Sequence, residues 1–246
     1  MPARKALTLS FWNKVNALAA KEKLFAKGDS VLLAVSGGPD SAALLHFFAG
    51  QARSRRLRLV VCHVNHNLRG KASAADAAFV RRLGREYGLE TEILSADVKR
   101  LAREQGKSLE HAARTARYRL LAAAAARHGC RVVAAGHHAD DHAETVLLNL
   151  LRGTEPKGLL GIPARRPLAG GRAPVFLVRP LLAVSRAEIE AYLKANGLSS
   201  RRDESNEDEK FTRNWIRKTL LPLMRRKQPR LREHLLKLSE KLARLL

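Results

Sequence analysis

The hexapeptide SGGPDS at residues 36–41 has the composition of a loop that binds an anion. It lies between an apolar run, SVLLAV, and a segment of helical pattern, so it joins a predicted strand to a predicted helix. Glycines let the backbone approach an anion closely, and hydroxyls and a helix N-terminus supply donors and positive potential. We therefore predict a phosphate-binding loop, with a plain glycine-rich turn as the alternative.

This loop differs from a Walker motif, because no GK[ST] follows and the lysine that holds a γ-phosphate is missing. A short loop of this kind suits pyrophosphate as a leaving group. Asp40 is placed to hold Mg²⁺ against that pyrophosphate, since Mg²⁺ takes one or two carboxylates together with phosphate oxygens.

A second group of carboxylates lies in GHHADDHAE, where Asp140, Asp141 and Glu144 fall on or just before one helical turn. Asp141 and Glu144 are three residues apart and therefore face the same side of a helix. They predict a site for Mg²⁺ or an amine, with helix capping and dipole matching as the alternative. The neighbouring histidines do not predict zinc, because no cysteine or glutamate completes a zinc geometry with them.

Basic residues in two further segments are candidates for contacts with phosphate. Arg114 and Arg117 lie three apart on a predicted helix, so both can reach one cleft and stabilise an α-phosphate or hold an RNA phosphate. The mixture of Arg, Asn, Asp and Ser at 201–217 suits hydrogen bonds to base edges and phosphates. A solvated basic helix face and a polar linker are the respective alternatives.

Several longer motifs resemble those of a known family. SGGPDS is similar to the loop of the PP-loop ATP pyrophosphatase superfamily. HVNHNLRG, ARTARY, GHHADDHAETVLLNLLRGT and RDESN…FTRNWIR resemble, in the same order, the motifs of the tRNA(Ile)-lysidine synthetase family. Two departures are His142, where the family usually has glutamine, and Glu155, where glycine is more usual.

The resemblance implies an ATP-dependent ligase that acts on isoleucine tRNA with a CAU anticodon. Such an enzyme adenylates the carbon-2 oxygen of the wobble cytidine and releases pyrophosphate, and the ε-amine of free L-lysine then displaces AMP. The implied cofactors are ATP and Mg²⁺. The implied catalytic residues are Asp40, Arg114, Arg117, Asp141 and Glu144, with Asp40 and Asp141 as metal ligands. ATP would contact Ala34, Val35, Ser36, Gly37, Gly38, Pro39, Asp40, Ser41, His63, Val64 and Asn65, and tRNA would contact Arg201, Arg202, Asn206, Arg213, Asn214 and Arg217.

Two rival functions can be weighed against this one. A tRNA thiolase of the same superfamily would be expected to use a CxxC pair, whereas Cys62 and Cys130 are far apart in the sequence. A catalytically silent RNA-binding protein with the same fold belongs to another class, and the intact Ser36, Asp40 and Ser41 argue against it.

The elements that must position these residues are short β-like runs that alternate with helical segments. This pattern is typical of an α/β fold with a parallel sheet covered by helices on both faces. Strands are expected at 30–35, 57–64, 91–98, 131–136 and 175–182, and helices at 11–26, 40–49, 73–87, 109–128, 140–151 and 185–196. SGGPDS, HVNHN and GHHADD each begin where a strand ends, so chemistry is expected at the carboxyl edge of the sheet.

The pattern changes after residue 151, where residues 153–174 hold five glycines and four prolines and predict a long loop. We assign residues 1–217 to a PP-loop catalytic domain and 218–246 to a basic helical extension. Residues 210–246 hold twelve Lys and Arg against two acidic residues, which predicts RNA binding, and a leucine stripe on the last helix predicts a packing surface. A short natural form, a trimmed chain and a chain completed by a homodimer partner would each fit this C-terminal end.

The composition bounds the class of protein. Its 246 residues include 46 Lys and Arg and 23 Asp and Glu, and the formal charge of +23 favours nucleic acid over a membrane as partner. A generally basic proteome is the alternative. No run approaches the roughly 18 apolar residues of a membrane span, and the N-terminus lacks the apolar region of a signal peptide. With two cysteines and no disulfide framework, we expect a cytoplasmic protein.

Overall fold

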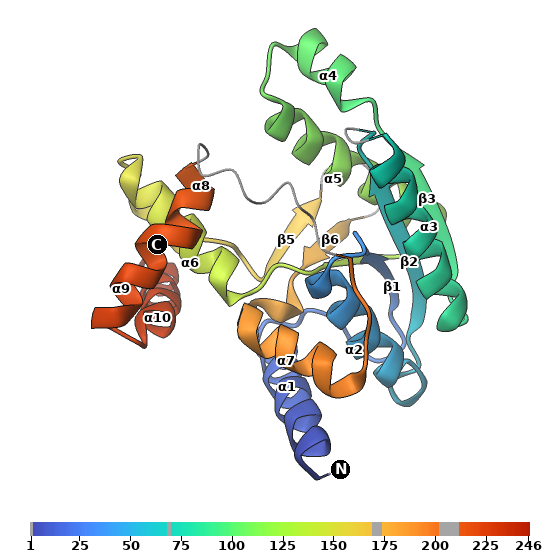
Figure 1. Ribbon diagram of the computed structural model, residues 1–246, viewed down its shortest axis with the longest axis horizontal. Coiled ribbons are helices and arrows are strands. Elements are labelled where there is room, and N and C mark those ends of the chain that lie inside the picture. Colours follow the sequence, from blue (N-terminus) through green and yellow to red (C-terminus); the bar gives the residue numbers. More distant parts are fainter. Residues whose placement is uncertain (1, 68–69, 169–173, 202–211) are drawn as a thin grey trace.

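One sheet forms the centre of the computed structural model, which describes residues 2–67, 70–168, 174–201 and 212–246 (Figure 1). Its strands are β1 (Ser30–Ala34), β2 (Arg58–Asn65), β3 (Glu90–Ser95), β4 (Val132–Ala135), β5 (Arg165–Leu168) and β6 (Val175–Val178). Within these ranges the strand order is β3-β2-β1-β4-β6-β5, and every pair is parallel except β5 with β6. The predicted parallel sheet is confirmed, with one antiparallel strand at its edge.

The strand order places a change of direction between β1 and β4. From β1 the chain proceeds to β2 and β3 on one side, and it later continues through β4 to β6 on the other side. Open α/β sheets bind ligands in the crevice that forms at such a point, beyond the carboxyl ends of the strands. The loop at 36–41 follows β1 and the GHH segment follows β4, so both begin at this crevice as expected.

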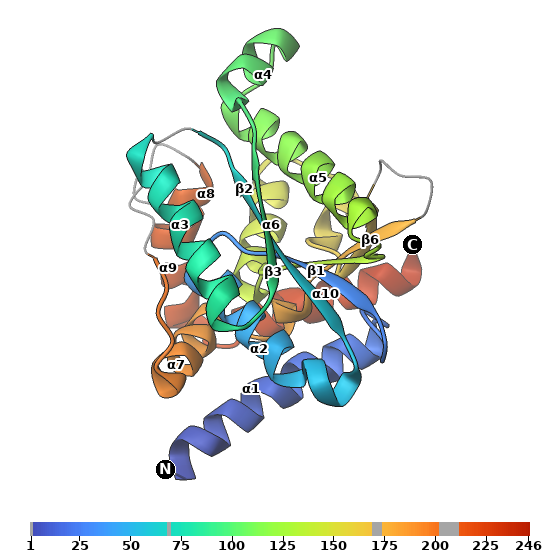
Figure 2. The same cartoon turned by 90° about the vertical axis from the view of Figure 1, so that its right-hand side faces the viewer.

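Helices cover both faces of the sheet (Figures 1 and 2). In chain order the longer ones are α1 (Pro2–Lys21), α2 (Pro39–Arg55), α3 (Lys71–Glu86), α4 (Val98–Gln105), α5 (Leu109–Arg127), α6 (Ala139–Leu151), α7 (Arg186–Asn196) and α10 (Leu231–Leu245). The shorter segments are η1 (Pro156–Leu160), η2 (Pro180–Ala183), α8 (Thr212–Trp215), η4 (Ile216–Leu220) and α9 (Leu221–Lys227). None of the helices in the described ranges is long and apolar enough to cross a membrane.

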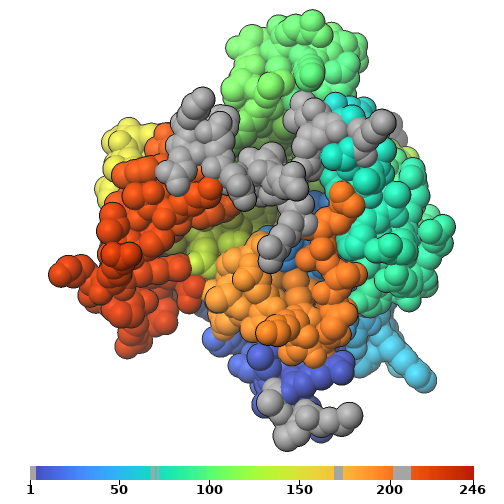
Figure 3. All heavy atoms as spheres, in the orientation of Figure 1, coloured from blue at the N-terminus to red at the C-terminus, as the bar shows by residue number. Residues whose placement is uncertain are grey.

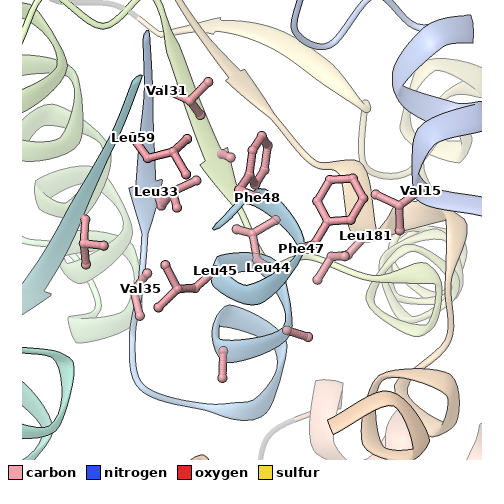
Figure 4. Close-up of a cluster of buried hydrophobic side chains, with 14 of the residues drawn as sticks. Val15, Val31, Leu33, Val35, Leu44, Leu45, Phe47, Phe48, Leu59 and Leu181 are labelled. Atoms are coloured by element: carbon pink, nitrogen blue, oxygen red, sulfur yellow. The ribbon is translucent and has the colours of Figure 1, made fainter. Parts of the chain in front are cut away.

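Alternate side chains of β1 pack into two separate cores. Val31 and Leu33 belong to the core that α1, α2, α3 and α7 cover, and Figure 4 shows them facing Leu44 and Phe48 of α2. Leu32 belongs to the other core, beneath α5. A strand that is buried on both faces reads as continuous apolar sequence, because each successive side chain meets a helix. This is why SVLLAV identified the central strand.

The C-terminal helices pack on α6 and η1 rather than on the sheet (Figures 1 and 2). Leu231 and Leu235 of α10 lie against a buried cluster that includes Leu147 of α6. Ion pairs from Arg225 and Arg232 to Asp140 join the same surfaces. Part of the leucine stripe thus finds its packing surface within the chain. The predicted boundary at 217/218 falls inside η4 and stays a prediction.

A buried histidine links α6 to α10. His142 Nδ1 accepts a hydrogen bond from the backbone N–H of Ile162 (3.2 Å), and its Nε2 lies 3.0 Å from Ser239 Oγ of α10. Ser239 Oγ in turn donates to the Leu159 carbonyl (2.7 Å). Burial lowers the pKa of His142, although the Ile162 backbone and Glu240 oppose this. The neutral ring therefore holds α10 in place.

We expect acid to weaken this link. Because the pKa of His142 is lower in the folded than in the unfolded protein, its stabilising effect is present above the ordinary histidine pKa and is lost as the pH falls through the folded value. The wild type should therefore lose more thermal stability than His142→Gln between about pH 7.5 and about pH 5.5. Melting temperatures of both proteins at the two pH values measure the difference. Equal losses would contradict the assigned role of His142.

Two helices differ from the sequence prediction. The first helix spans Pro2–Lys21 instead of 11–26, because Lys23 takes a positive φ of 49° and ends the helical region early. Helix α4 was not predicted, because the extended run was expected to end at Val98, where α4 begins, and the residues after it were assigned to no element. Its boundaries carry ordinary signals, since Asp97 accepts a hydrogen bond from the Arg100 backbone N–H and Gly106 caps the other end.

Candidate nucleotide-binding site

The loop at 36–41 is organised around the hydroxyl group of Ser41. Ser41 Oγ accepts hydrogen bonds from the backbone N–H groups of Ser36 (3.2 Å) and Gly37 (3.1 Å) and donates to the Gly38 carbonyl (2.9 Å). Gly37 has a φ of +93°, which favours glycine because a side chain would strain the turn. Gly38 is the N-cap of α2 and supplies no side-chain acceptor to the first turn. The loop thus presents its hydroxyls and the start of α2 as an anion-binding concavity.

A cavity of about 530 Å³ opens beside this loop. Ligand pockets commonly measure roughly 300 to 1,000 Å³, so the space suits a nucleotide. The predicted ATP-binding residues that line it are Ala34, Val35, Ser36, Gly38, Asp40, Ser41, His63, Val64 and Asn65. Gly37 and Pro39 do not line it. Gly37 lies in the turn with a positive φ, and Pro39 is the first residue of α2. The loop after β1 and the last residues of β2 therefore meet around one space.

Asp40 faces this cavity and is paired with a residue that the sequence did not single out. Arg186 Nη1, from the first turn of α7, donates to both carboxylate oxygens of Asp40 at 2.9 and 2.8 Å. Burial raises the pKa of Asp40, although His138 and Arg186 act to lower it. No local pattern could have revealed Arg186, since 146 positions separate the pair.

The end of β4 comes close to the loop. A Cβ atom on Gly136 would lie 3.0 Å from the backbone carbon of Asp40, so this approach requires a glycine. His138, which caps α6, has its Nε2 3.8 Å from Asp40 Oδ1 and 3.5 Å from Asp141 Oδ2. The two predicted metal ligands thus flank one imidazole ring.

The described residues contain no group of three or more His, Cys, Asp or Glu side chains arranged to hold a metal ion. Two carboxylates nevertheless fit Mg²⁺, because this ion fills its other positions with phosphate oxygens and water. Asp40 and Asp141, which each lie near His138, are the candidates for such a pair.

Asp141 and Glu144 do not line the cavity, and they contact two of the predicted RNA-binding arginines instead. The buried carboxylate of Glu144 accepts hydrogen bonds from Arg213 Nε (3.1 Å) and from Arg217 Nε (2.6 Å). Arg217 Nη2 also lies 3.3 Å from Asp141 Oδ1. Burial opposes ionisation of Asp141, but His138 and Arg213 outweigh it and lower the pKa of this carboxyl.

Arg201, which was predicted to contact tRNA, lies at the nucleotide cavity. Its backbone N–H donates to the Gly37 carbonyl (2.9 Å), and its Nε lies 2.5 Å from Asp76 Oδ1. It therefore ties the chain after α7 to the phosphate-binding loop. Of the other predicted residues, Arg117 lines the cavity, Arg114 does not, Asn214 lies on α8, and Arg202 and Asn206 lie outside the described residues.

The cavity is also lined by residues that were not predicted, among them His66, His137 and Tyr118. Burial lowers the pKa of His66 to about 4, with help from Arg117, and it lowers the pKa of His137 to about 3, with help from Arg179. Both rings are therefore neutral near pH 7. His66 stood inside the HVNHN motif, whereas nothing in the sequence marked Tyr118 beyond its place in ARTARY.

The sequence is similar to those of known proteins. The model of an ATP-binding family, described as the PP-loop domain, matches residues 7–224. Among curated proteins, a tRNA(Ile)-lysidine synthase of Geobacillus kaustophilus is 43% identical over 231 residues, which cover 94% of this chain and 49% of the relative. That of Geobacter sulfurreducens is 46% identical over 231 residues, covering 94% and 47%. The chain thus spans about half the length of these relatives.

Solved structures share the fold at lower sequence identity. The U34-tRNA thiolase NcsA from Methanococcus maripaludis, with its [4Fe-4S] cluster, has a TM-score of 0.80 and 17% identity, covering 98% of this chain and 81% of that one. An NH3-dependent NAD synthetase from Campylobacter jejuni has a TM-score of 0.51 and 18% identity, covering 98% and 95%. At these identities the likeness concerns the fold alone.

Proposed function

This chain belongs to the PP-loop domain family, and from that premise we propose that it is an ATP-dependent ligase that forms lysidine on isoleucine tRNA. The observation that carries the proposal is the meeting, at one cavity, of the Ser41-centred loop, Asp40 and Arg117. These are the groups that bind phosphates and stabilise charge on an attacked α-phosphorus. The similarity to curated tRNA(Ile)-lysidine synthases supports the choice of substrate.

In the proposed first step, the carbon-2 oxygen of the wobble cytidine attacks the α-phosphorus of ATP, and pyrophosphate leaves. The loop at 36–41 would hold the phosphates, while Ala34, Val35 and the segment 63–65 would lie along the adenosine. Mg²⁺, when bound by Asp40 and Asp141, would neutralise charge on the leaving pyrophosphate. Arg117 would stabilise the charge that develops on the α-phosphate.

In the proposed second step, the ε-amine of L-lysine attacks carbon 2 of the cytidine, and AMP leaves with the transferred oxygen. Glu144 is suited to hold an ammonium group of lysine, because it is a carboxylate on the same face of α6 as the proposed metal ligand Asp141. In the free protein Arg213 and Arg217 neutralise both carboxylates. An RNA phosphate that draws these arginines away would release Glu144 for lysine.

Contacts with tRNA are proposed for the arginines and asparagines near the C-terminal end of the family match. These are Arg201, Arg202, Asn206, Arg213, Asn214 and Arg217. The formal charge of +23 supports a polyanionic partner of this kind.

The test is mass spectrometry of isoleucine tRNA after incubation with ATP and L-lysine. A mass gain at the wobble cytidine that equals lysine minus water is expected, and omission of either lysine or ATP should abolish it. Methionine tRNA, which shares the CAU anticodon, provides the specificity control. An unmodified wobble base with protein that still exchanges labelled pyrophosphate into ATP would exclude lysine as the amine. Absence of both reactions would favour a silent RNA-binding protein.

The cytoplasm is the proposed setting, since free tRNA, ATP and lysine occur together there. A homodimer is the proposed assembly, because Leu238 and Leu245 of α10 remain 42% and 80% exposed. Light scattering of the purified protein distinguishes a monomer from a homodimer.

A further inference from the structure

Three guanidinium groups lie over one tyrosine ring beside the nucleotide cavity, and a fourth, buried one acts on the same tyrosine. Arg114 and Arg117, on the same helix as Tyr118, have their guanidinium carbons 5.2 and 5.0 Å from the centre of its ring. Arg166 of β5 lies 4.6 Å from the same centre. Arg179 follows β6, is only 1% exposed, donates from Nη1 to the Pro163 carbonyl (2.5 Å), and its charge acts to lower the pKa of Tyr118. We call these four arginines with Tyr118 the arginine cluster.

The charge of the arginine cluster is uncompensated. Among the described residues we find no carboxylate paired with any of its four guanidinium groups, and Arg179 Nε has no hydrogen-bond partner. Contacts with an aromatic face stabilise a guanidinium group only modestly at partly exposed sites, and the guanidinium groups meanwhile repel one another. A buried arginine is ordinarily paired. The arginine cluster therefore has the chemistry of an anion site that lacks its anion.

The position of the arginine cluster distinguishes it from the proposed ATP site. Arg117 and Tyr118 line the nucleotide cavity, but Arg114, Arg166 and Arg179 do not. Arg166 and Arg179 belong to β5 and the end of β6, whereas the proposed adenosine contacts follow β1 and β2 on the other side of β4. Neighbouring strands are about 4.8 Å apart, so β6 lies roughly 10 Å from β1. The positive surface thus continues past the cavity toward the sheet edge.

We propose that the two outer guanidinium groups of the arginine cluster, those of Arg114 and Arg166, hold a backbone phosphate of the RNA substrate beside the nucleotide cavity. Arg179 is a positioning residue in this arrangement, because its side chain is buried, is held by the Pro163 carbonyl and adds positive charge beside Tyr118. The proposal rests on the proposed function in one respect, the identity of the anion as RNA. An extended chain fits better than a second small anion, since Arg117 lines the cavity while Arg166 lies on β5, on the far side of β4 from the loop at 36–41.

Tyr118 supplies a readout that does not depend on catalysis. Burial opposes its ionisation, but Arg117, Arg114 and Arg179 outweigh this and lower the pKa of Tyr118 to about 8. Burial raises the pKa of the two other tyrosines, Tyr87 and Tyr192, the latter to about 12. Ultraviolet absorbance of tyrosinate therefore reports Tyr118 alone near pH 8, and Tyr118→Phe provides the blank.

We expect a saturating RNA stem-loop carrying the CAU anticodon to raise the pKa of Tyr118, because a bound phosphate offsets the positive charge around the ring. ATP with Mg²⁺ should produce a smaller shift. An equal or larger shift with ATP would assign the arginine cluster to the nucleotide and overturn the proposal. An unchanged titration in the presence of bound RNA would also overturn it.

Neighbouring arginines of β5 provide a matched pair of variants. Arg166 points toward Tyr118, while Arg165 points to the opposite face of the sheet and stacks over Phe176 (4.0 Å). Arg166→Gln should weaken binding of the stem-loop about three- to tenfold and reduce the log–log salt slope by about 0.7, whereas Arg165→Gln should leave both unchanged. Equal effects, or a lower melting temperature of Arg166→Gln with unaltered RNA binding, would show that the arginine cluster only packs.

Failure of this proposal is separable from failure of the proposed function. If lysidine forms but Arg166→Gln binds RNA like the wild type, the anion site is wrong and the ligase stands. If no lysidine forms while only Arg166→Gln loses RNA affinity, the anion site stands and the ligase is wrong.

Discussion

Replacing Asp40 with asparagine should reduce pyrophosphate release at least about a hundredfold while leaving tRNA binding nearly intact. The carboxylate lies at the phosphate-binding loop, where its charge would hold Mg²⁺ against the leaving group. It contacts none of the predicted RNA-binding residues, because its partners are Arg186 and His138. The effect should therefore fall on kcat. Burst measurements of pyrophosphate at saturating ATP and tRNA give the rate.

A second variant separates metal binding from the ion pair. Asp40→Asn also removes the partner of Arg186, so a loss of activity alone leaves two explanations. Arg186→Gln breaks the same pair and leaves the carboxylate in place. We expect it to keep most of the activity, since Arg186 does not line the cavity. Near-normal turnover of Asp40→Asn would remove the metal role, and equal losses in both variants would assign the effect to the pair.

The strands that carry the site were predictable because their signals are local. β1 is buried on both faces, so its apolar run could be recognised without knowledge of its neighbours. β5 was not predictable, and its residues were assigned to a long loop. Its sequence, RRPL, has no apolar alternation, and it contains a proline that only an edge strand tolerates.

The residues of the candidate site also fall into two groups, those that local sequence patterns predicted and those that they did not. The hydroxyls and glycines of the loop at 36–41 act through contacts within six residues, so composition and spacing revealed them. The pair of Asp40 with Arg186 and the pairs of Glu144 with Arg213 and Arg217 join distant parts of the chain. Only the docking of α7 and of the C-terminal helices creates these contacts. Asp141 and Glu144, whose spacing predicted a ligand site, are thus neutralised by arginines of the segment 201–217, whose composition predicted RNA contacts.

Deletion of the chain after Pro222 should lower both thermal stability and the salt dependence of tRNA binding. It removes Leu231 and Leu235 from the cluster on α6 and breaks the contact between Ser239 and His142. Loss of these partly buried groups costs roughly 3 to 4 kcal/mol, which corresponds to a fall of about 10 °C in melting temperature for a chain of this length. Differential scanning calorimetry measures the fall in melting temperature. In the face of the molecule that Figure 3 shows, the C-terminal helices (red) and α3 (teal) lie on opposite sides, and α7 (orange) lies between them.

Charged side chains of α10 can be replaced while the residues through which this helix packs are kept. Lys237, Lys241 and Arg244 are exposed and recur at the spacing of one helix face, while Leu235 and Ser239 face α6 and η1. Replacing these three with glutamine should reduce the log–log salt slope of tRNA binding by roughly two, at about 0.7 for each phosphate on a largely single-stranded loop. The melting temperature should not change. A slope equal to that of the wild type would mean that α10 serves only to cover α6. RNA binding would then depend on the arginines nearer the cavity.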